Sequence, residues 1–279
     1  MSNMQIRPLA DRTRFERMTT EELRAAFLVE GLFSEDAVQL VHWEAERTIV
    51  GSACPTIRPL PLAPPSEIKA EFFLERRELG AVNLGGPGSV TVDGVRHPMG
   101  HRDLLYIGCG ARSVVFQTAE IVNPARFWLV SHPAHAAHPT RRITAAEAET
   151  VSIGDAAHAT ARVLRRYVHA RGAPSCQLVM GVTDIESGSV WNTMPPHTHT
   201  RRTEIYLYFD LEPGAVAFHV MGPAEATRHL VVRDLEAVLS PSWSTHFGAG
   251  TSRYAFVWSM GGENQEFEDM QALPLGALR

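Results

Sequence analysis

Short apolar runs separated by turn residues recur through most of this 279-residue sequence. Residues 81–84 and 89–92 lie on either side of a Gly-Gly-Pro-Gly segment, and the Asp93-Gly94 pair that follows is a hairpin turn signal. Short strands at this spacing, with turns of Gly, Pro and Asp, indicate an all-β sandwich or barrel. The other runs are 104–107, 113–116, 127–130, 176–182, 204–209, 215–220, 229–232 and 254–258.

Two segments carry helical signals instead. Thr19 and Glu22 have the spacing of a capping box, which predicts a helix over about residues 19–32. Thr144 and Glu147 have the same spacing and open a stretch rich in Ala, Glu and Arg that runs to about residue 169. We interpret this second stretch as the connection between two halves of the chain, part helix and part irregular.

Composition excludes several classes of protein. Hydrophobic residues make up 44% and charged residues 20%, so the chain can bury a core without disulfides and is not disordered. The net charge of −5 argues against a general binder of nucleic acid or of anionic membranes. The sequence has three cysteines, an odd number, and they are far apart. This pattern fits a reducing compartment and predicts a cytoplasmic protein. No secretory signal and no apolar run of about 18 residues is readable.

Four residues combine into a predicted metal site. His197 and His199 are two residues apart, so on a strand both side chains point to the same face. Glu204 begins the next apolar run, and His246 follows a second strand-to-turn boundary at 240–246. Three imidazoles and one carboxylate suit a borderline divalent ion such as zinc, with water or substrate completing the coordination shell.

This pattern resembles the cupin superfamily, whose first motif reads H-x-H-x(3,4)-E and whose second reads P-x-G-x-x-H. Pro241 and His246 have the separation of the second motif, although Trp243 replaces the usual glycine. The resemblance implies two fused jelly-roll β-barrels with a few short helices. We expect an N-terminal half at 1–145 and a metal-binding C-terminal half at 146–279.

The first half resembles a degenerate cupin. Residues 103–113 follow the second motif with Ser113 at the histidine position, and Glu78 matches the motif glutamate. Glu71 and Phe73 stand where the histidines of the first motif would be. We therefore expect one metal ion per chain, in the C-terminal half.

A closer resemblance covers almost the whole chain. Segments 73–80, 101–103, 191–195, 197–199, 240–244 and 262–265 are similar to the 5-keto-4-deoxyuronate isomerases. These are bacterial zinc-containing two-cupin proteins that assemble as hexamers and act on unsaturated uronates released from pectin. The resemblance implies interconversion of 4-deoxy-L-threo-5-hexosulose uronate (5-dehydro-4-deoxy-D-glucuronate) and 3-deoxy-D-glycero-2,5-hexodiulosonate. It also implies that the zinc ligands are His197, His199, Glu204 and His246.

Such a reaction needs a group that moves a proton, and the sequence does not identify the base. If Glu204 leads its strand into the barrel, Tyr206 and Tyr208 share its face, and their hydroxyls are candidates to orient or protonate substrate oxygens. The alternative is that both are core aromatics with satisfied hydroxyls.

The substrate's carboxylate calls for a cation. Arg201 and Arg202 lie between the ligand histidines and Glu204, and a guanidinium matches a carboxylate with two hydrogen bonds. Trp191 and Trp243 flank the two motifs and are candidates to wall the pocket. Solvated turn arginines and plain packing are the alternatives. Further arginine candidates are Arg162, Arg165 and Arg166.

Two other functions remain open at this stage. The same three-histidine, one-glutamate site holds iron in cupin oxygenases, and a non-catalytic sugar-binding cupin would keep the pocket without turnover. His132, His135 and His138 repeat every three residues, but Pro133 and Pro139 disfavour a regular helix, so we expect no second metal site there.

Overall fold

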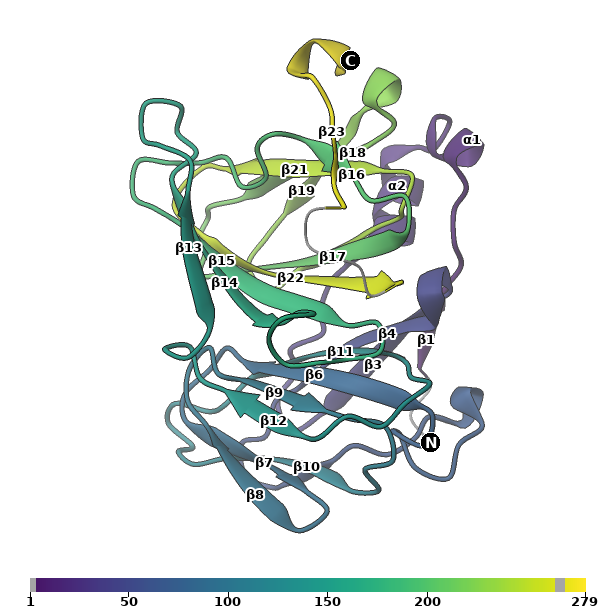
Figure 1. Cartoon of the computed structure of the whole chain (residues 1–279), viewed down its shortest axis with the longest axis vertical. Coiled ribbons are helices and arrows are strands. Elements are labelled where there is room, and N and C mark those ends of the chain that lie inside the picture. The colour runs from purple at the N-terminus through teal and green to yellow at the C-terminus, as the bar shows by residue number, and fades with distance from the viewer. Residues whose placement is uncertain (1–3, 264–268) are drawn as a thin grey trace. The chain divides into compact units, whose positions relative to one another are not determined.

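The computed structural model describes residues 4–263 and 269–279, and strands dominate both of its compact units (Figure 1). The prediction of an all-β protein with a few short helices is confirmed. The first unit comprises residues 1–7, 32–148 and 167–179, and the second comprises 8–31, 149–166 and 180–279. Asn264 and Gln265, which belong to the C-terminal resemblance motif, lie outside the described residues.

The first unit contains two sheets and two 3-10 turns, η1 (Ala45–Arg47) and η2 (Ser66–Ile68). The larger sheet has the order β1 (Gln5–Arg7), β3 (Val38–Trp43), β4 (Thr48–Ala53), β11 (Phe127–Pro133), β6 (Arg77–Asn83), β9 (Leu104–Ile107) and β12 (Arg141–Ile143). The smaller sheet has the order β5 (Leu60–Pro61), β10 (Val114–Thr118), β7 (Gly88–Val92) and β8 (Val95–Met99).

The hairpin predicted at Asp93-Gly94 joins β7 to β8. Val92 pairs with Val95, so the loop has two residues. Both take positive φ angles, 46° at Asp93 and 83° at Gly94. Those angles match the turn whose twist suits a two-residue hairpin, which explains why Asp-Gly stands there.

Apolar side chains fill the core of the first unit. Leu79 and Ala81 on β6, from the larger sheet, belong to the same buried cluster as Val114 and Phe116 on β10, from the smaller one. They alternate along their strands with residues of the opposite face, as a pleated strand requires. The two sheets therefore enclose one apolar core.

The second unit also has two sheets, together with the helices α1 (Arg12–Phe15) and α2 (Thr20–Phe27) and the 3-10 turns η3 (Ala224–Ala226) and η4 (Leu275–Ala277). Its larger sheet has the order β13 (Glu149–Ile153), β14 (Arg162–Val168), β15 (Val179–Ile185), β22 (Ala255–Gly262), β17 (Arg202–Phe209), β20 (Ala237–Ser240) and β2 (Leu28–Val29). Its smaller sheet has the order β19 (Arg228–Val232), β18 (Ala217–Gly222), β21 (Thr245–Gly250), β16 (His197–Thr198) and β23 (Gln271–Ala272).

The two units differ from the consecutive halves 1–145 and 146–279 in two places. Residues 8–31 group with the second unit and residues 167–179 with the first. The first exchange has a clear physical cause, because Phe15 and Phe27 of the two helices pack edge-to-face on Trp243. The strand β2 also pairs with β20 of the second unit.

Two helix predictions need correction. The capping box of Thr19 and Glu22 is present, but α2 ends at Phe27 because Leu28 and Val29 pair with β20 instead. Thr144 and Glu147 also exchange hydrogen bonds, yet they close only a turn. The stretch predicted as part helix holds the antiparallel strands β13 and β14. In the described chain no helix is long and apolar enough to cross a membrane.

Candidate metal centre

Three neighbouring strand regions of the second unit bring the predicted ligands together. His197 lies in β16 and pairs directly with His246 in β21. His199 follows at the end of β16, where its carbonyl accepts a hydrogen bond from the Arg202 amide and the chain turns. Glu204 lies two residues into β17, in the facing sheet. The strand pairing therefore assembles a site whose members span 50 residues of sequence.

The ligand atoms converge on one point. His197 Nε2 lies 3.1 Å from His199 Nε2. Glu204 Oε2 lies 3.2 Å from His199 Nε2 and 2.8 Å from His246 Nε2. One donor atom of each of the four residues lies within 4.8 Å of all the others, and all four residues are buried. Three nitrogens and one carboxylate oxygen directed at a common centre fit a divalent metal ion.

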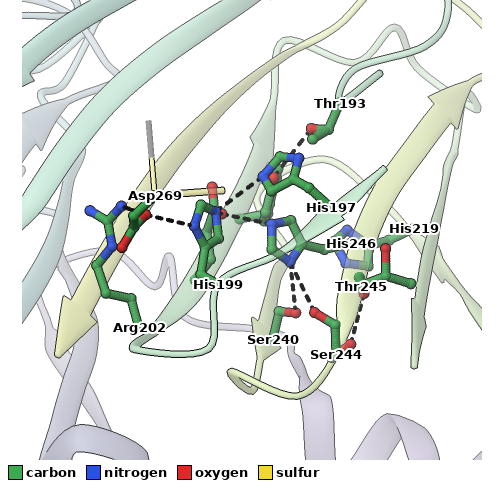
Figure 2. Close-up of polar contacts among 12 residues, drawn as sticks. Thr193, His197, His199, Arg202, His219, Ser240, Ser244, Thr245, His246 and Asp269 are labelled. Carbon is green, nitrogen blue, oxygen red and sulfur yellow. Dashed lines mark hydrogen bonds and ion pairs between the residues drawn. The ribbon is translucent and has the colours of Figure 1, made fainter. Parts of the chain in front are cut away.

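The second ring nitrogen of each histidine has its own partner, and Figure 2 shows those of His199 and His246. His197 Nδ1 lies 3.2 Å from the Pro195 carbonyl oxygen, and His199 Nδ1 lies 3.3 Å from Asp269 Oδ1. Partners at Nδ1 fix the orientation of a ring and leave Nε2 for the metal. The third histidine is held in the same way, since His246 Nδ1 lies 3.3 Å from the Ser244 carbonyl and 3.4 Å from Ser240 Oγ.

Asp269 and Arg202 form a second layer beside His199. Arg202 NH2 pairs with the same Asp269 oxygen that faces His199 Nδ1. The Arg202 side chain is fully buried, and Figure 2 shows Asp269 between this guanidinium and the His199 ring. The buried guanidinium therefore holds the partly buried carboxylate in place against the His199 ring.

The pKa shifts of His197 and Glu204 favour the protonation states that bind metal. Burial, together with the neighbouring His246, lowers the pKa of His197 to about 3, so its imidazole is neutral at physiological pH. Burial alone would raise the pKa of Glu204, but His246 and His199 lower it well below its usual range. Neutral imidazoles and an ionised carboxylate are the ligand forms that coordinate a metal.

The centre borders a cavity of about 230 Å³. His197, His199, Glu204 and Tyr206 line one part of it. Such a space suits one small molecule. The rest of the lining is Ile153, Arg162, Leu164, Thr183, Asn192, Thr193, Met194, Pro195, Phe256, Trp258, Met260 and Met270.

Of the two tyrosines predicted to be catalytic, one lines this cavity and the other does not. Tyr206 lines it, and its hydroxyl lies 3.2 Å from Thr193 Oγ1. Burial and the nearby Glu204 raise the pKa of Tyr206 well above its usual range, so the phenol stays protonated. Tyr208 is not in the lining; its hydroxyl accepts from Asn192 Nδ2 at 3.1 Å and contacts His219 Nδ1 at 2.8 Å. Catalytic roles for either tyrosine stay predictions.

The predicted substrate-binding residues do not line the cavity. Arg201 is more than half exposed and pairs with Glu263, while Arg202 is turned to Asp269. Trp191 lies against Phe247, with ring centroids 6.3 Å apart, and Trp243 packs on α1 and α2. Their roles in binding stay predictions. Of the further arginines, Arg165 pairs with Asp184 and Arg166 with Glu149, and only Arg162 lines the cavity.

The described residues contain one cluster with the arrangement of a metal site. His132 is buried in the first unit, where its Nδ1 lies 3.2 Å from Thr48 Oγ1, and His135 is exposed. Cys54, Cys109 and Cys176 are free thiols.

Sequence reasoning missed three polar residues at or near the centre. Asp269 lies 70 residues after His199, and no local motif marks it. Thr193 and His219 contact the two tyrosines, and only the period-two pattern around them could have suggested that they face inward.

Comparison with known structures places the fold in the cupin class. An IolB-like protein from Salmonella typhimurium aligns with a TM-score of 0.72 at 14% identity, covering 88% of this chain and 96% of that one. An oxalate decarboxylase from Lactobacillus farciminis aligns with a TM-score of 0.58 at 9% identity, covering 81% and 79%. The predicted cupin fold is confirmed, and the second unit carries a centre that could hold a metal.

Sequence comparison gives the family. The model of the KduI/IolB family matches residues 27–273, and this chain belongs to that family. A relative from Opitutus terrae is 49% identical over 95% of this chain and 96% of its own length. Another from Dickeya dadantii is 44% identical over 99% of this chain and all of its own. Both are named 4-deoxy-L-threo-5-hexosulose-uronate ketol-isomerase, and the chain is accordingly an enzyme of the isomerase class.

Proposed function

We propose that this chain is a zinc-dependent aldose–ketose isomerase that interconverts 4-deoxy-L-threo-5-hexosulose uronate and 3-deoxy-D-glycero-2,5-hexodiulosonate. The proposal is carried by the convergence of His197, His199, Glu204 and His246 beside a cavity for one small molecule. The relatives that bear the isomerase name support the choice of substrate, since they match over nearly the whole chain.

The reaction moves a hydrogen from the carbon that bears the hydroxyl to the carbonyl carbon, either as a proton through an enediol or as a hydride. A divalent ion held by the four residues would supply Lewis-acid chemistry at the oxygens of these carbons. Tyr206 is a protonated phenol on the cavity wall and can donate a hydrogen bond to a substrate oxygen. Tyr208 packs on Tyr206, with ring centroids 6.3 Å apart, and so helps to orient it.

Zinc is the proposed ion because three imidazoles and one carboxylate form a set of nitrogen and oxygen donors that suits it. The same donors also bind iron, which would suit an oxygenase. Elemental analysis of the purified protein separates the two: zinc without oxygen consumption supports the isomerase, and iron with oxygen uptake supports the oxygenase.

The cellular setting is part of the same proposal. By its resemblance to the 5-keto-4-deoxyuronate isomerases, we propose that the chain acts in the cytoplasm as a homo-hexamer. It would serve there in the catabolism of pectin and related polyuronates, on a small keto-deoxyuronate. The free thiols of Cys54, Cys109 and Cys176 are compatible with a reducing compartment.

Metal content and isomerase activity of the wild type and of Glu204→Ala test the proposal together. Glu204→Ala removes the ligand that bridges the two sheets, so bound zinc and turnover should both fall to a small fraction of wild type. Glu236→Ala is the matched control, because Glu236 is a buried carboxylate of the same unit that accepts from the Arg233 amide. Zinc-loaded wild type that fails to turn over the uronate, beside a relative that does, would refute the proposal.

A further inference from the structure

Among the described residues that line the cavity, Arg162 is the one whose charge the candidate metal centre does not explain. It is the first residue of β14 and only 8% exposed. Leu164, two residues on, lines the same cavity, so the inward face of the strand holds both side chains. In the described lining it is the only lysine or arginine.

Two backbone carbonyls hold the guanidinium in place. Arg162 NH1 donates to the Thr160 oxygen and NH2 to the Met194 oxygen, each at 2.9 Å. Met194 belongs to the segment that leads into His197, so the same short stretch of chain positions the arginine and the first ligand. The side chain is therefore fixed before any ligand enters.

Neutral carbonyls do not neutralise a buried cation. Arg165 and Arg202 of the same unit each pair with an aspartate, whereas within residues 4–263 and 269–279 no carboxylate pairs with Arg162. A guanidinium has five N–H donors, and a buried charge without a partner is costly. An anion that enters the cavity would remove this cost and gain a charge-assisted, two-pronged contact.

We propose that Arg162 binds the carboxylate of the substrate and makes the enzyme specific for acids over neutral sugars. This inference rests on the proposed function, which supplies a ligand with one carboxylate. The rest of the lining beyond the metal ligands is largely apolar, with Met194, Phe256 and Trp258 among its members. The acid group therefore has one cationic position in the cavity, and the carbonyl and hydroxyl groups are left to the centre at His197 and Glu204.

The inference is tested by changing the protein and the substrate separately and together. One change is Arg162→Gln, and the other is methyl esterification of the uronate, which removes its charge. In wild type, kcat/KM for the acid should exceed that for the ester about 100-fold, because a charge-assisted pair is lost with the ester. In Arg162→Gln this preference should shrink to within a few-fold, since the cation is absent. Arg162→Lys keeps the charge without the planar fork and should fall between the two.

Two controls keep the outcome specific. Bound zinc in Arg162→Gln should equal that of wild type, which separates binding of the acid from damage to the centre. Arg253→Gln removes an exposed arginine of the same unit and should leave the preference unchanged. The wild-type ratio of acid to ester needs no variant, so a poorly folding Arg162→Gln does not remove the test.

The results also separate this inference from the proposed function. Wild type that isomerises acid and ester equally well would overturn the role of Arg162 and leave the isomerase intact. If wild type does not isomerise either compound, calorimetric binding decides: preference for the acid that is lost in Arg162→Gln supports the carboxylate site alone. Equal binding of acid and ester overturns it.

Discussion

The two units of this chain have similar strand orders but carry different side chains on corresponding strands. Their larger sheets have the orders β1-β3-β4-β11-β6-β9-β12 and β13-β14-β15-β22-β17-β20-β2, and their smaller sheets contain β5-β10-β7-β8 and β16-β21-β18-β19. By position in these orders, β6 corresponds to β17 and β10 to β21. The pairs β6–β11 and β17–β22 are both antiparallel, as this correspondence requires.

On the faces that point into each barrel, the corresponding strands carry different side chains. On β6, Leu79 and Ala81 belong to an apolar cluster, whereas β17 carries Glu204 at the candidate metal centre. On β10, Phe116 is buried in the same apolar cluster, whereas β21 carries His246. The strand arrangement therefore does not by itself create a functional site. The inward-facing side chains determine whether the interior of a barrel is an apolar core or a binding site.

The difference also has an energetic side. Burial of apolar side chains stabilises the first unit in proportion to the area removed from water. In the second unit buried imidazoles and carboxylates must be desolvated, and contacts among themselves or with a metal only partly offset that cost. We therefore expect substitutions in the apolar core of the first unit to change stability. Substitutions at the centre of the second unit should change metal binding.

Phe116→Ala is expected to have the largest effect on stability. Phe116 is fully buried, and removing a buried phenylalanine costs about 3–5 kcal/mol through lost burial and the cavity left behind. Urea denaturation should show this loss, while folded protein keeps its zinc and its kcat/KM. Phe218→Ala is the matched control, because Phe218 is 40% exposed and should cost less than about 1 kcal/mol. Loss of zinc from folded Phe116→Ala would contradict the division of roles.

Asp269→Asn should lower metal affinity, and it should also lower stability because the buried guanidinium of Arg202 loses its ionised partner. The uncharged amide weakens the contact to His199 Nδ1, and loss of such an outer partner typically lowers metal affinity about 10–100-fold. The zinc dissociation constant, measured by competition with a chelator, should rise by that factor, while kcat at saturating zinc changes little.

The control for this change is Glu263→Gln. Glu263 pairs with Arg201 at the surface, where both side chains are more than half exposed, and such pairs contribute little. Equal zinc affinity for Asp269→Asn and wild type would mean that the second layer beside His199 has no influence on the metal.

Local spacing in the sequence predicted the parts of this molecule that depend on neighbouring residues. The two-residue separation of His197 and His199 placed both on one side of the centre, and Asp93-Gly94 marked a real hairpin. Both features follow from strand geometry over a few residues.

The parts that were missed depend on contacts between distant segments. The helix that begins at Thr20 ends early because Leu28 pairs with Val238, more than 200 residues away. Asp269 reaches His199 across 70 residues, and Arg162 is held by Met194 across 32. Propensity and spacing carry no information on such pairings, so only the fold revealed the second layer of the centre and singled out Arg162 from the arginine candidates.

The smallest predicted effect concerns His132 on β11, a buried histidine of the first unit. Burial, with a contribution from Arg77, lowers its pKa from an ordinary 6.5 to about 3. Between these values the unfolded chain binds a proton that the folded chain does not, so the free energy of unfolding falls as the pH falls, by up to about 1.4 kcal/mol per pH unit. His132→Gln removes this group, so the slope of stability against pH between 6 and 4.5 should become shallower by about that amount. Urea denaturation with a chelator present measures this slope without protons linked to metal binding. The control is His135→Gln, which changes an exposed histidine and should keep the wild-type slope. An unchanged slope in His132→Gln would show that the buried ring already carries a proton in the folded state.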